Sequence, residues 1–135
     1  MDWITNEIAI GNYQDAANVE LLAAEGFQSL LCLDGSHRPD ASTIGIDTCD
    51  TFDLIDGPGN EAYRFQQAVK RLVELVEDHT VFLVHCHAGR SRSPLVVAGF
   101  LIVTKNSQPD VAIAKIGEKR EINISSGLED LLYWL

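Results

Sequence analysis

Near the middle of the chain, a polar loop joins a short apolar run to a long one. The sequence reads VFLV over residues 81–84, HCHAGRSRS over 85–93 and PLVVAGFLIV over 94–103. The first run has the length and β-branched residues of a buried strand, whereas the second is apolar on all sides and predicts a buried helix. A buried strand that leads through a short loop into a buried helix favours an α/β fold, in which ligands bind beyond the carboxyl ends of the strands.

Strands and helices alternate along the rest of the chain. The predicted strands are residues 8–10, 28–33, 48–56 and 81–84, and the predicted helices are 16–25, 61–77 and 93–104. Residues 34–43 have the composition of a polar loop, while Ser107-x-x-Asp110 and Ser126-x-x-Glu129 predict two more helices that open with capping boxes. We therefore predict one α/β domain over residues 1–135, with a central, mainly parallel, twisted sheet flanked by helices.

The composition is that of a globular protein with an acidic surface. Hydrophobic residues make up 46% of the 135 residues and charged residues 22%, and twenty acidic residues against ten basic ones give a net charge of −10. Such a surface disfavours nucleic acid and anionic membranes as partners. The apolar stretch 94–103 is too short to cross a bilayer, and the N-terminus lacks the pattern of a signal peptide. Three cysteines without metal-ligand spacing fit a reducing compartment, so we expect a cytoplasmic protein, and we also expect a monomer.

Cys86 and Arg92 enclose five residues, and this C-x5-R loop (residues 86–92) is the main candidate site. A loop that precedes a helix can turn successive backbone N–H groups inward, and the helix dipole adds positive potential, so the loop predicts a phosphate-binding site. Arg92 can bind two oxygens of a phosphate group, and Gly89 permits a backbone conformation that a side chain would forbid. The predicted substrate-binding residues are His87, Ala88, Gly89, Arg90, Ser91 and Arg92.

Cys86 lies in the same positive field. A helix N-terminus and inward N–H groups stabilise the thiolate, which is the nucleophilic form of cysteine. A nucleophile beneath a bound oxyanion suits phosphoryl transfer through a phosphocysteine intermediate, and nothing in the sequence points to a metal or an organic cofactor. We therefore predict that Cys86 and Arg92 are catalytic.

The pattern H-C-x-x-G-x-S-R-S over residues 85–93 resembles the signature of the dual-specificity phosphatases, within the cysteine-dependent protein tyrosine phosphatase superfamily. The N-terminal segment ITNEIAIGNYQDA is similar to the opening strand and first helix of that family. The resemblance implies an enzyme that hydrolyses phosphotyrosine and phosphoserine or phosphothreonine in proteins. It also implies that Ser93 donates a hydrogen bond to the cysteine sulfur and that His85 supports the loop through hydrogen bonds.

The resemblance further implies an aspartic acid that protonates the leaving oxygen and later activates water. Asp56, thirty positions before Cys86, ends a predicted strand and precedes the glycine-rich segment GPGN, where an acid could move toward the substrate. Asp53 is the rival, but strand alternation directs it nearly opposite to Asp56. We therefore predict Asp56 as the catalytic acid.

Other functions and roles stay open from the sequence. Some superfamily members that act on phosphoinositides carry basic residues at the positions of His87 and Arg90, so a phosphoinositide or another non-protein phosphate is the alternative substrate. A module that binds phosphate without turning it over is the second alternative. Cys49 is either a thiol that traps oxidised Cys86 or a packed strand residue, and Cys32 is expected in the core.

Overall fold

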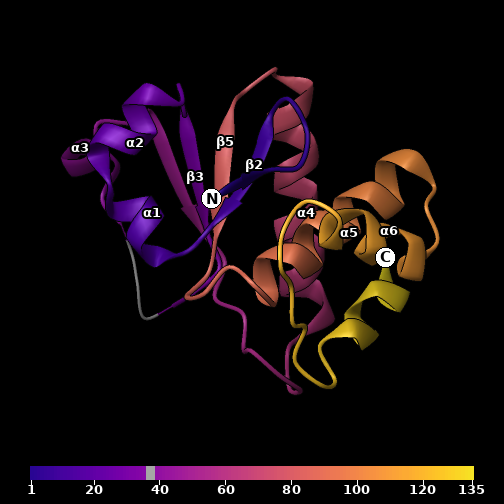
Figure 1. The fold of residues 1–135 in the computed structure, drawn as a ribbon. Coiled ribbons are helices and arrows are strands. Elements are labelled where there is room, and N and C mark those ends of the chain that lie inside the picture. Colours follow the sequence, from indigo (N-terminus) through magenta and orange to yellow (C-terminus); the bar gives the residue numbers. More distant parts are fainter. Residues whose placement is uncertain (36–38) are drawn as a thin grey trace.

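The computed structural model describes residues 1–35 and 39–135. It has the predicted α/β fold, with a mostly parallel five-stranded sheet in the order β1-β2-β5-β3-β4 and helices on both faces (Figure 1). The strands are β1 (Asp2–Trp3), β2 (Ile8–Gly11), β3 (Ser29–Cys32), β4 (Thr48–Thr51) and β5 (Phe82–His85). The helices are α1 (Tyr13–Ala17), α2 (Val19–Ala24), α3 (Ala41–Ile44), α4 (Ala62–Glu77), α5 (Arg92–Lys105), α6 (Pro109–Gly117) and the 3-10 helix η1 (Glu129–Trp134).

β5, the strand before the C-x5-R loop, lies at the centre of the sheet. It pairs in parallel with β2 on one side and with β3 on the other, while β3 pairs in parallel with β4 and β1 runs antiparallel to β2. The register places His85 opposite both Gly11 and Cys32, so β2, β5 and β3 end at the same level. The loops that leave these carboxyl ends therefore begin side by side, where ligands bind in sheets of this kind.

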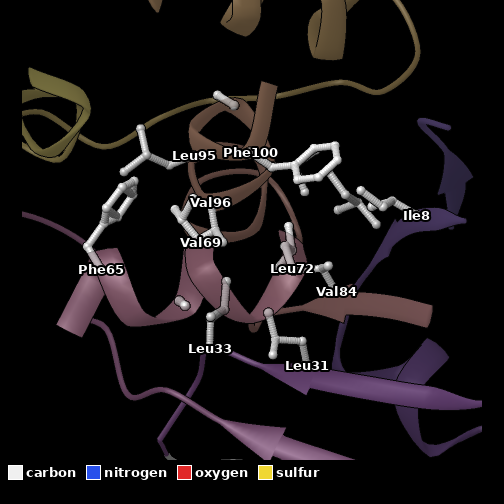
Figure 2. Packing of buried hydrophobic residues seen from close by; sticks show 14 of the residues in the cluster. Ile8, Leu31, Leu33, Phe65, Val69, Leu72, Val84, Leu95, Val96 and Phe100 are labelled. Atoms are coloured by element: carbon white, nitrogen blue, oxygen red, sulfur yellow. The ribbon is translucent and has the colours of Figure 1, made fainter. Parts of the chain in front are cut away.

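Each face of the sheet has its own helical layer. Helices α1, α2 and α3 contribute Ala16, Leu22 and Ile44 to the smaller apolar cluster, whereas α4, α5, α6 and η1 build the larger one on the opposite face (Figure 1). Figure 2 shows side chains of α5, α4 and the strands meeting in this larger cluster. Every residue from 93 to 101 of α5 is buried, which confirms the predicted buried helix. Within the described residues, no helix has the length and apolarity to cross a membrane.

The helix predicted over residues 16–25 is two short helices. Asn18 ends α1 with extended backbone, and its side-chain oxygen accepts a hydrogen bond from the amide of Leu21 at the start of α2. Asn12 opens α1 by a reciprocal pair of hydrogen bonds with Asp15. Asparagine is a favourable N-cap residue. Asn18 therefore ends one helix and starts the next, although the apolar spacing that predicted a single helix continues across it.

Two predictions on the β4 side of the sheet also needed correction. The strand predicted over 48–56 stops at Thr51, so the second half of that segment belongs to a loop. The predicted polar loop 34–43 contains the start of α3, where the side chain of Asp40 accepts the amide of Ser42, and its residues 36–38 lie outside the described residues. Short polar caps of this kind define helices too brief to show an apolar period.

The two C-terminal helices exist as α6 and η1, but neither opens with the predicted capping box. Their N-cap residues are Gln108 and Leu128, and neither makes a side-chain cap hydrogen bond. Pro109 occupies the first turn of α6, where its fixed backbone angle favours a helix start without a side-chain cap. The serine patterns therefore predicted the two helices, although neither helix begins with the capping box on which the prediction rested.

Gly99 lets α5 approach α4 closely. A Cβ at this position would lie 2.7 Å from Cγ2 of Val69 and 3.2 Å from Cζ of Phe65. Both neighbours belong to the buried core, where close packing leaves them little room to move. This small residue therefore sets the separation between the helix after the C-x5-R loop and the helix after the Asp56 loop.

We expect Gly99→Ala to lower the free energy of unfolding by about 1–3 kcal/mol, because overpacking outweighs the helix-propensity gain of ~1 kcal/mol. Gly117→Ala is the matched control, since a Cβ at this last residue of α6 would lie 3.6 Å from Ile122, an ordinary contact. Urea unfolding of both variants measures the difference. A Gly99→Ala protein as stable as Gly117→Ala would contradict the packing argument.

Candidate active site

A pocket of about 460 Å³ lies at the carboxyl edge of the sheet. Three loops that follow strands contribute to it: Asp34 comes after β3, Asp56 after β4 and the C-x5-R loop after β5. The lining residues are Asp34, Asp56, Cys86, His87, Ala88, Arg90, Ser91, Arg92, Asn123 and Ser125. Its size is typical of a small-molecule site, and it gathers Cys86, Arg92 and Asp56 into one recess.

The carbonyl groups of the C-x5-R loop bind outward to surrounding segments. Four consecutive carbonyl oxygens accept hydrogen bonds from outside the loop, over distances of 2.7 to 3.3 Å. The acceptors are His87, Ala88, Gly89 and Arg90, and the donors are the amide of Tyr13, Nη2 and Nε of Arg120, and the amide of Asn123. Because the carbonyls are held by these partners, the opposite side of each peptide unit is left for the loop interior.

The amide groups of the same loop are available to a ligand. Within the part of the chain that the structure describes, no backbone N–H of residues 87–91 donates a hydrogen bond to another protein group. These groups precede the first turn of α5, a helix of 14 residues whose dipole makes this end positive. Unsatisfied N–H groups at a helix N-terminus form a site for a phosphate or a similar anion.

Cys86 and Arg92 lie at the two ends of this loop and both face the pocket. Cys86 lines it while only 2% of the residue is exposed, so the thiol belongs to the pocket floor. The Arg92 side chain is 12% exposed, and its Nη1 donates to the carbonyl of Leu54 at 3.2 Å. Its Nε is buried with no hydrogen-bond partner among the described residues, which leaves a donor for an oxyanion.

Asp34 is a pocket residue that the sequence analysis missed. Its Oδ1 lies 3.9 Å from Nη1 of Arg92, and its Oδ2 lies 3.8 Å from Nδ1 of His87. The carboxylate is buried, so its charge acts on Arg92 with less screening than a surface charge would. Its position directly after a predicted strand was a usable signal, because the same reasoning selected Asp56.

Gly89 has the special backbone conformation that the sequence analysis expected. Its φ angle is +71°, in the left-handed region, and a Cβ would collide with the carbonyl group of Gly11 at the end of β2. A side chain here would therefore strain the backbone and push the loop away from the sheet. Gly89 itself is absent from the pocket lining, so its contribution is to the shape of the loop.

Of the two candidate acids, Asp56 lines the pocket and Asp53 does not. Asp56 is exposed in the loop between β4 and α4, whereas the carboxylate of Asp53 faces Gly35. Asn60 closes the Asp56 loop, since its side chain accepts the amide of Ile55 and donates to the carbonyl of Ile55, both at 2.7 Å. The loop is thus closed around the acid while the acid itself stays at the pocket mouth.

Ser93 and His85 are fully buried and do not line the pocket. Oγ of Ser93 has no hydrogen-bond partner among the described residues, so a bond to the Cys86 sulfur is not formed in this state. His85 is the last residue of β5, directly before Cys86. Their roles toward the sulfur and the loop remain predictions.

The other two cysteines lie on the opposite face of the sheet from Cys86. Cys86 belongs to the larger apolar cluster, whereas Cys49 packs against the smaller one and Cys32 shares a sheet face with Leu30 of that cluster. Burial raises the pKa of Cys32 to about 12 and also raises the pKa of Cys49. Both thiols are therefore protonated at neutral pH, and Cys32 is a core residue as expected.

The segment before η1 forms a further wall that the sequence analysis missed. Asn123 and Ser125 line the pocket, and the amide of Ser125 donates to Oγ of Ser91 at 2.9 Å. Arg120 reaches from this segment to the loop carbonyls and to Oδ2 of Asp2, at 2.7 Å. Their distance along the sequence from Cys86 hid these contacts, because no local pattern relates them to the loop.

A model of the dual specificity phosphatase catalytic domain matches residues 12–133. The chain belongs to this family. The match covers every loop that lines the pocket, including the C-x5-R loop and the wall before η1. The family assignment and the α/β fold thus agree with what the sequence pattern predicted.

Known relatives support the assignment. The protein-tyrosine-phosphatase IBR5 of Arabidopsis thaliana is 29% identical over 100 residues, which are 71% of this chain and 35% of that protein. The chain therefore spans about a third of the length of this curated relative.

Solved structures share the fold over nearly the whole chain. The human tyrosine phosphatase-like serine/threonine/tyrosine-interacting protein is similar with a TM-score of 0.87 and 23% identity, over 99% of this chain and 93% of that one. A mouse putative dual specificity phosphatase complexed with zinc tungstate has a TM-score of 0.86 and 21% identity, over 98% and 84%. PTPMT1 in complex with PI(5)P has a TM-score of 0.74 and 20% identity, over 96% and 89%.

Arg120→Ala should weaken the anion site, because it removes the donors to the Ala88 and Gly89 carbonyls. We expect the free energy of unfolding to fall by about 2–4 kcal/mol, and the rise in Tm that inorganic phosphate gives the wild type to shrink. Lys119→Ala, an exposed neighbour with the same charge change, is the control. Thermal unfolding with and without phosphate measures both effects, and equal phosphate responses in the two variants would refute the supporting role.

Proposed function

We propose that this chain is a cysteine-dependent phosphatase that hydrolyses phosphomonoesters, on phosphotyrosine and on phosphoserine or phosphothreonine, through a phosphocysteine intermediate. The observation that carries the proposal is the joint position of Cys86, Arg92 and Asp56 in one pocket whose loop amides are free for an anion. A nucleophile, an oxyanion site and an acid are the three components that such a phosphoryl transfer needs. Membership of the dual specificity phosphatase family supports the same reaction.

In the first step, the sulfur of Cys86 attacks the phosphorus and forms an S–P bond while the bond from phosphorus to the leaving oxygen breaks. Asp56 gives its proton to the leaving oxygen, so the product alcohol or phenol departs neutral. The guanidinium of Arg92 and the amides of residues 87–91 hold the three remaining oxygens and stabilise their charge.

In the second step, the carboxylate of Asp56 takes a proton from water as the water oxygen attacks phosphorus. The S–P bond breaks, inorganic phosphate leaves, and Cys86 returns as a thiolate. We propose that Ser93 Oγ, buried and without a partner in the free state, turns to donate to this departing sulfur. His85, buried directly before Cys86, would hold the strand end in place.

The proposed reaction needs no metal and no organic cofactor, because protein groups supply the nucleophile, the acid and the oxyanion donors. We further propose a cytoplasmic location, since a catalytic thiolate must stay reduced, and the lack of a disulfide among the three described cysteines agrees with it. That the substrate is a protein and that the chain is a monomer are still predictions.

We expect Cys86→Ser to abolish turnover of an aryl phosphate, because a serine hydroxyl in this site is a far weaker nucleophile than a thiolate. Cys49→Ser is the matched control, since Cys49 lies on the other sheet face. Release of phosphate, measured without metal and with a chelator present, gives the rates. Full activity of Cys86→Ser would exclude the mechanism, and wild-type binding of a phosphopeptide without phosphate release would favour the binding module.

Asp56→Asn should slow hydrolysis of a phosphoserine peptide by about 10²–10⁴-fold, because the amide cannot protonate a poor leaving group. The loss should be smaller for an aryl phosphate with a good leaving group, which departs without a proton. Asp53→Asn, outside the pocket, serves as the comparison. If Asp53→Asn shows the larger loss on the phosphoserine peptide, the acid has been assigned to the wrong residue.

A further inference from the structure

Two basic side chains, His87 and Arg90, stand at the pocket mouth, where the sequence left open an extra site for a polyanionic substrate. The structure places a carboxylate near each of them. Nδ1 of His87 lies 3.8 Å from Asp34 Oδ2, and Nη2 of Arg90 lies 3.8 Å from Glu121 Oε2. A second phosphate group bound beside either side chain would therefore also meet a carboxylate.

Contacts on its other side also hold His87 in place. Its ring stacks on the ring of Tyr13, with centroids 4.6 Å apart and planes 8° from parallel. The amide of Tyr13 donates to the carbonyl of His87 at 3.0 Å. Stacking and the backbone hydrogen bond thus hold the imidazole at one side of the mouth, although 63% of its side chain is exposed.

The backbone sets the proximity of Glu121 to Arg90. The amide of Asn123 donates to the carbonyl of Arg90 at 2.7 Å, which holds the segment of Glu121 against the C-x5-R loop. The two side chains are 56% and 80% exposed, so their ion pair contributes little to stability. The backbone hydrogen bond nevertheless keeps the Glu121 carboxylate within side-chain reach of Arg90.

The charges around the pocket consequently do not favour a polyanion. Arg92 is needed by the phosphate that reacts, and Glu121 lies beside Arg90, the other guanidinium that lines the pocket. The net charge of −10 extends the same sign over the rest of the chain. A complementary ligand brings one phosphate into the pocket and positive charge to its mouth.

We infer that Glu121 makes this pocket selective for phosphomonoesters flanked by cationic groups, namely phosphopeptides with Lys or Arg beside the phosphorylated residue. The inference depends on the proposed function and specifies its substrate class. Polyphosphorylated inositols and phosphoinositides are disfavoured, because their additional phosphates would meet Glu121 beside Arg90.

The first experiment compares kcat/KM of the wild type on two phosphotyrosine peptides of equal length, one with flanking Lys and Arg and one with flanking Asp and Glu. Vesicles that contain PI(5)P and a soluble inositol polyphosphate complete the panel. We expect the basic peptide to be preferred at least about tenfold at low ionic strength, with a smaller ratio as salt screens the mouth. A preference for the acidic peptide or for either inositol substrate would overturn the inference.

The second experiment tests Glu121 itself. Glu121→Gln should reduce the basic-to-acidic ratio by about threefold, because Arg90 then becomes available to anionic flanks. Glu77→Gln changes the net charge equally but lies at the end of α4, near the opposite edge of the sheet, and should leave the ratio unchanged. Equal ratios in Glu121→Gln and Glu77→Gln would show that the mouth charge does not select substrates.

An aryl phosphate without flanking charge separates this inference from the proposed function. If Cys86→Ser no longer hydrolyses the aryl phosphate and the peptide ratios are as expected, the result supports both the proposed function and the selectivity. Turnover that depends on Cys86 but favours acidic or inositol substrates refutes the selectivity alone. Absence of any Cys86-dependent turnover refutes the proposed function and the selectivity with it.

Discussion

The outward orientation of four consecutive carbonyls is the interaction on which the candidate site depends. A peptide unit has its N–H and C=O on opposite sides, so partners for the carbonyls decide where the amides are directed. Tyr13 at the start of α1, and Arg120 and Asn123 in the segment before η1, supply those partners from two distant parts of the chain. The anion site is thus a product of the whole fold, because residues 86–92 alone could not hold all their amides away from water and toward one ligand.

A strongly acidic protein can hold an anion site because the attraction is local. The amides, the α5 dipole and Arg92 act over a few ångströms inside a recess, whereas the net charge of −10 acts at the surface, where ions screen it. The recess can therefore attract the one phosphate group that reacts while the surface repels further phosphate groups of the same ligand. Arg92, with 12% of its side chain exposed, lies inside the recess, whereas Glu121, with 80% exposed, lies at the surface.

The local pattern of the chain predicted the fold class and the centre of the site, while contacts over long sequence distances escaped it. The strand–loop–helix run located Cys86, Arg92 and the buried α5, because apolar period and loop chemistry are encoded by neighbouring residues. Arg120 and Asn123 reach the loop only through tertiary packing, which no short pattern records. The missed boundaries, such as the break at Asn18, follow from single capping hydrogen bonds that override the apolar period.

The sheet separates Cys86 from the other two thiols of the chain, and this has a consequence under oxidative stress. Peroxide would convert the nucleophile to a sulfenic acid, and because Cys32 and Cys49 face the opposite layer, an internal S–S bond would require the backbone to move. Rescue would then fall to external reductants such as glutathione, and prolonged exposure would carry the sulfur on to irreversible sulfinic and sulfonic states.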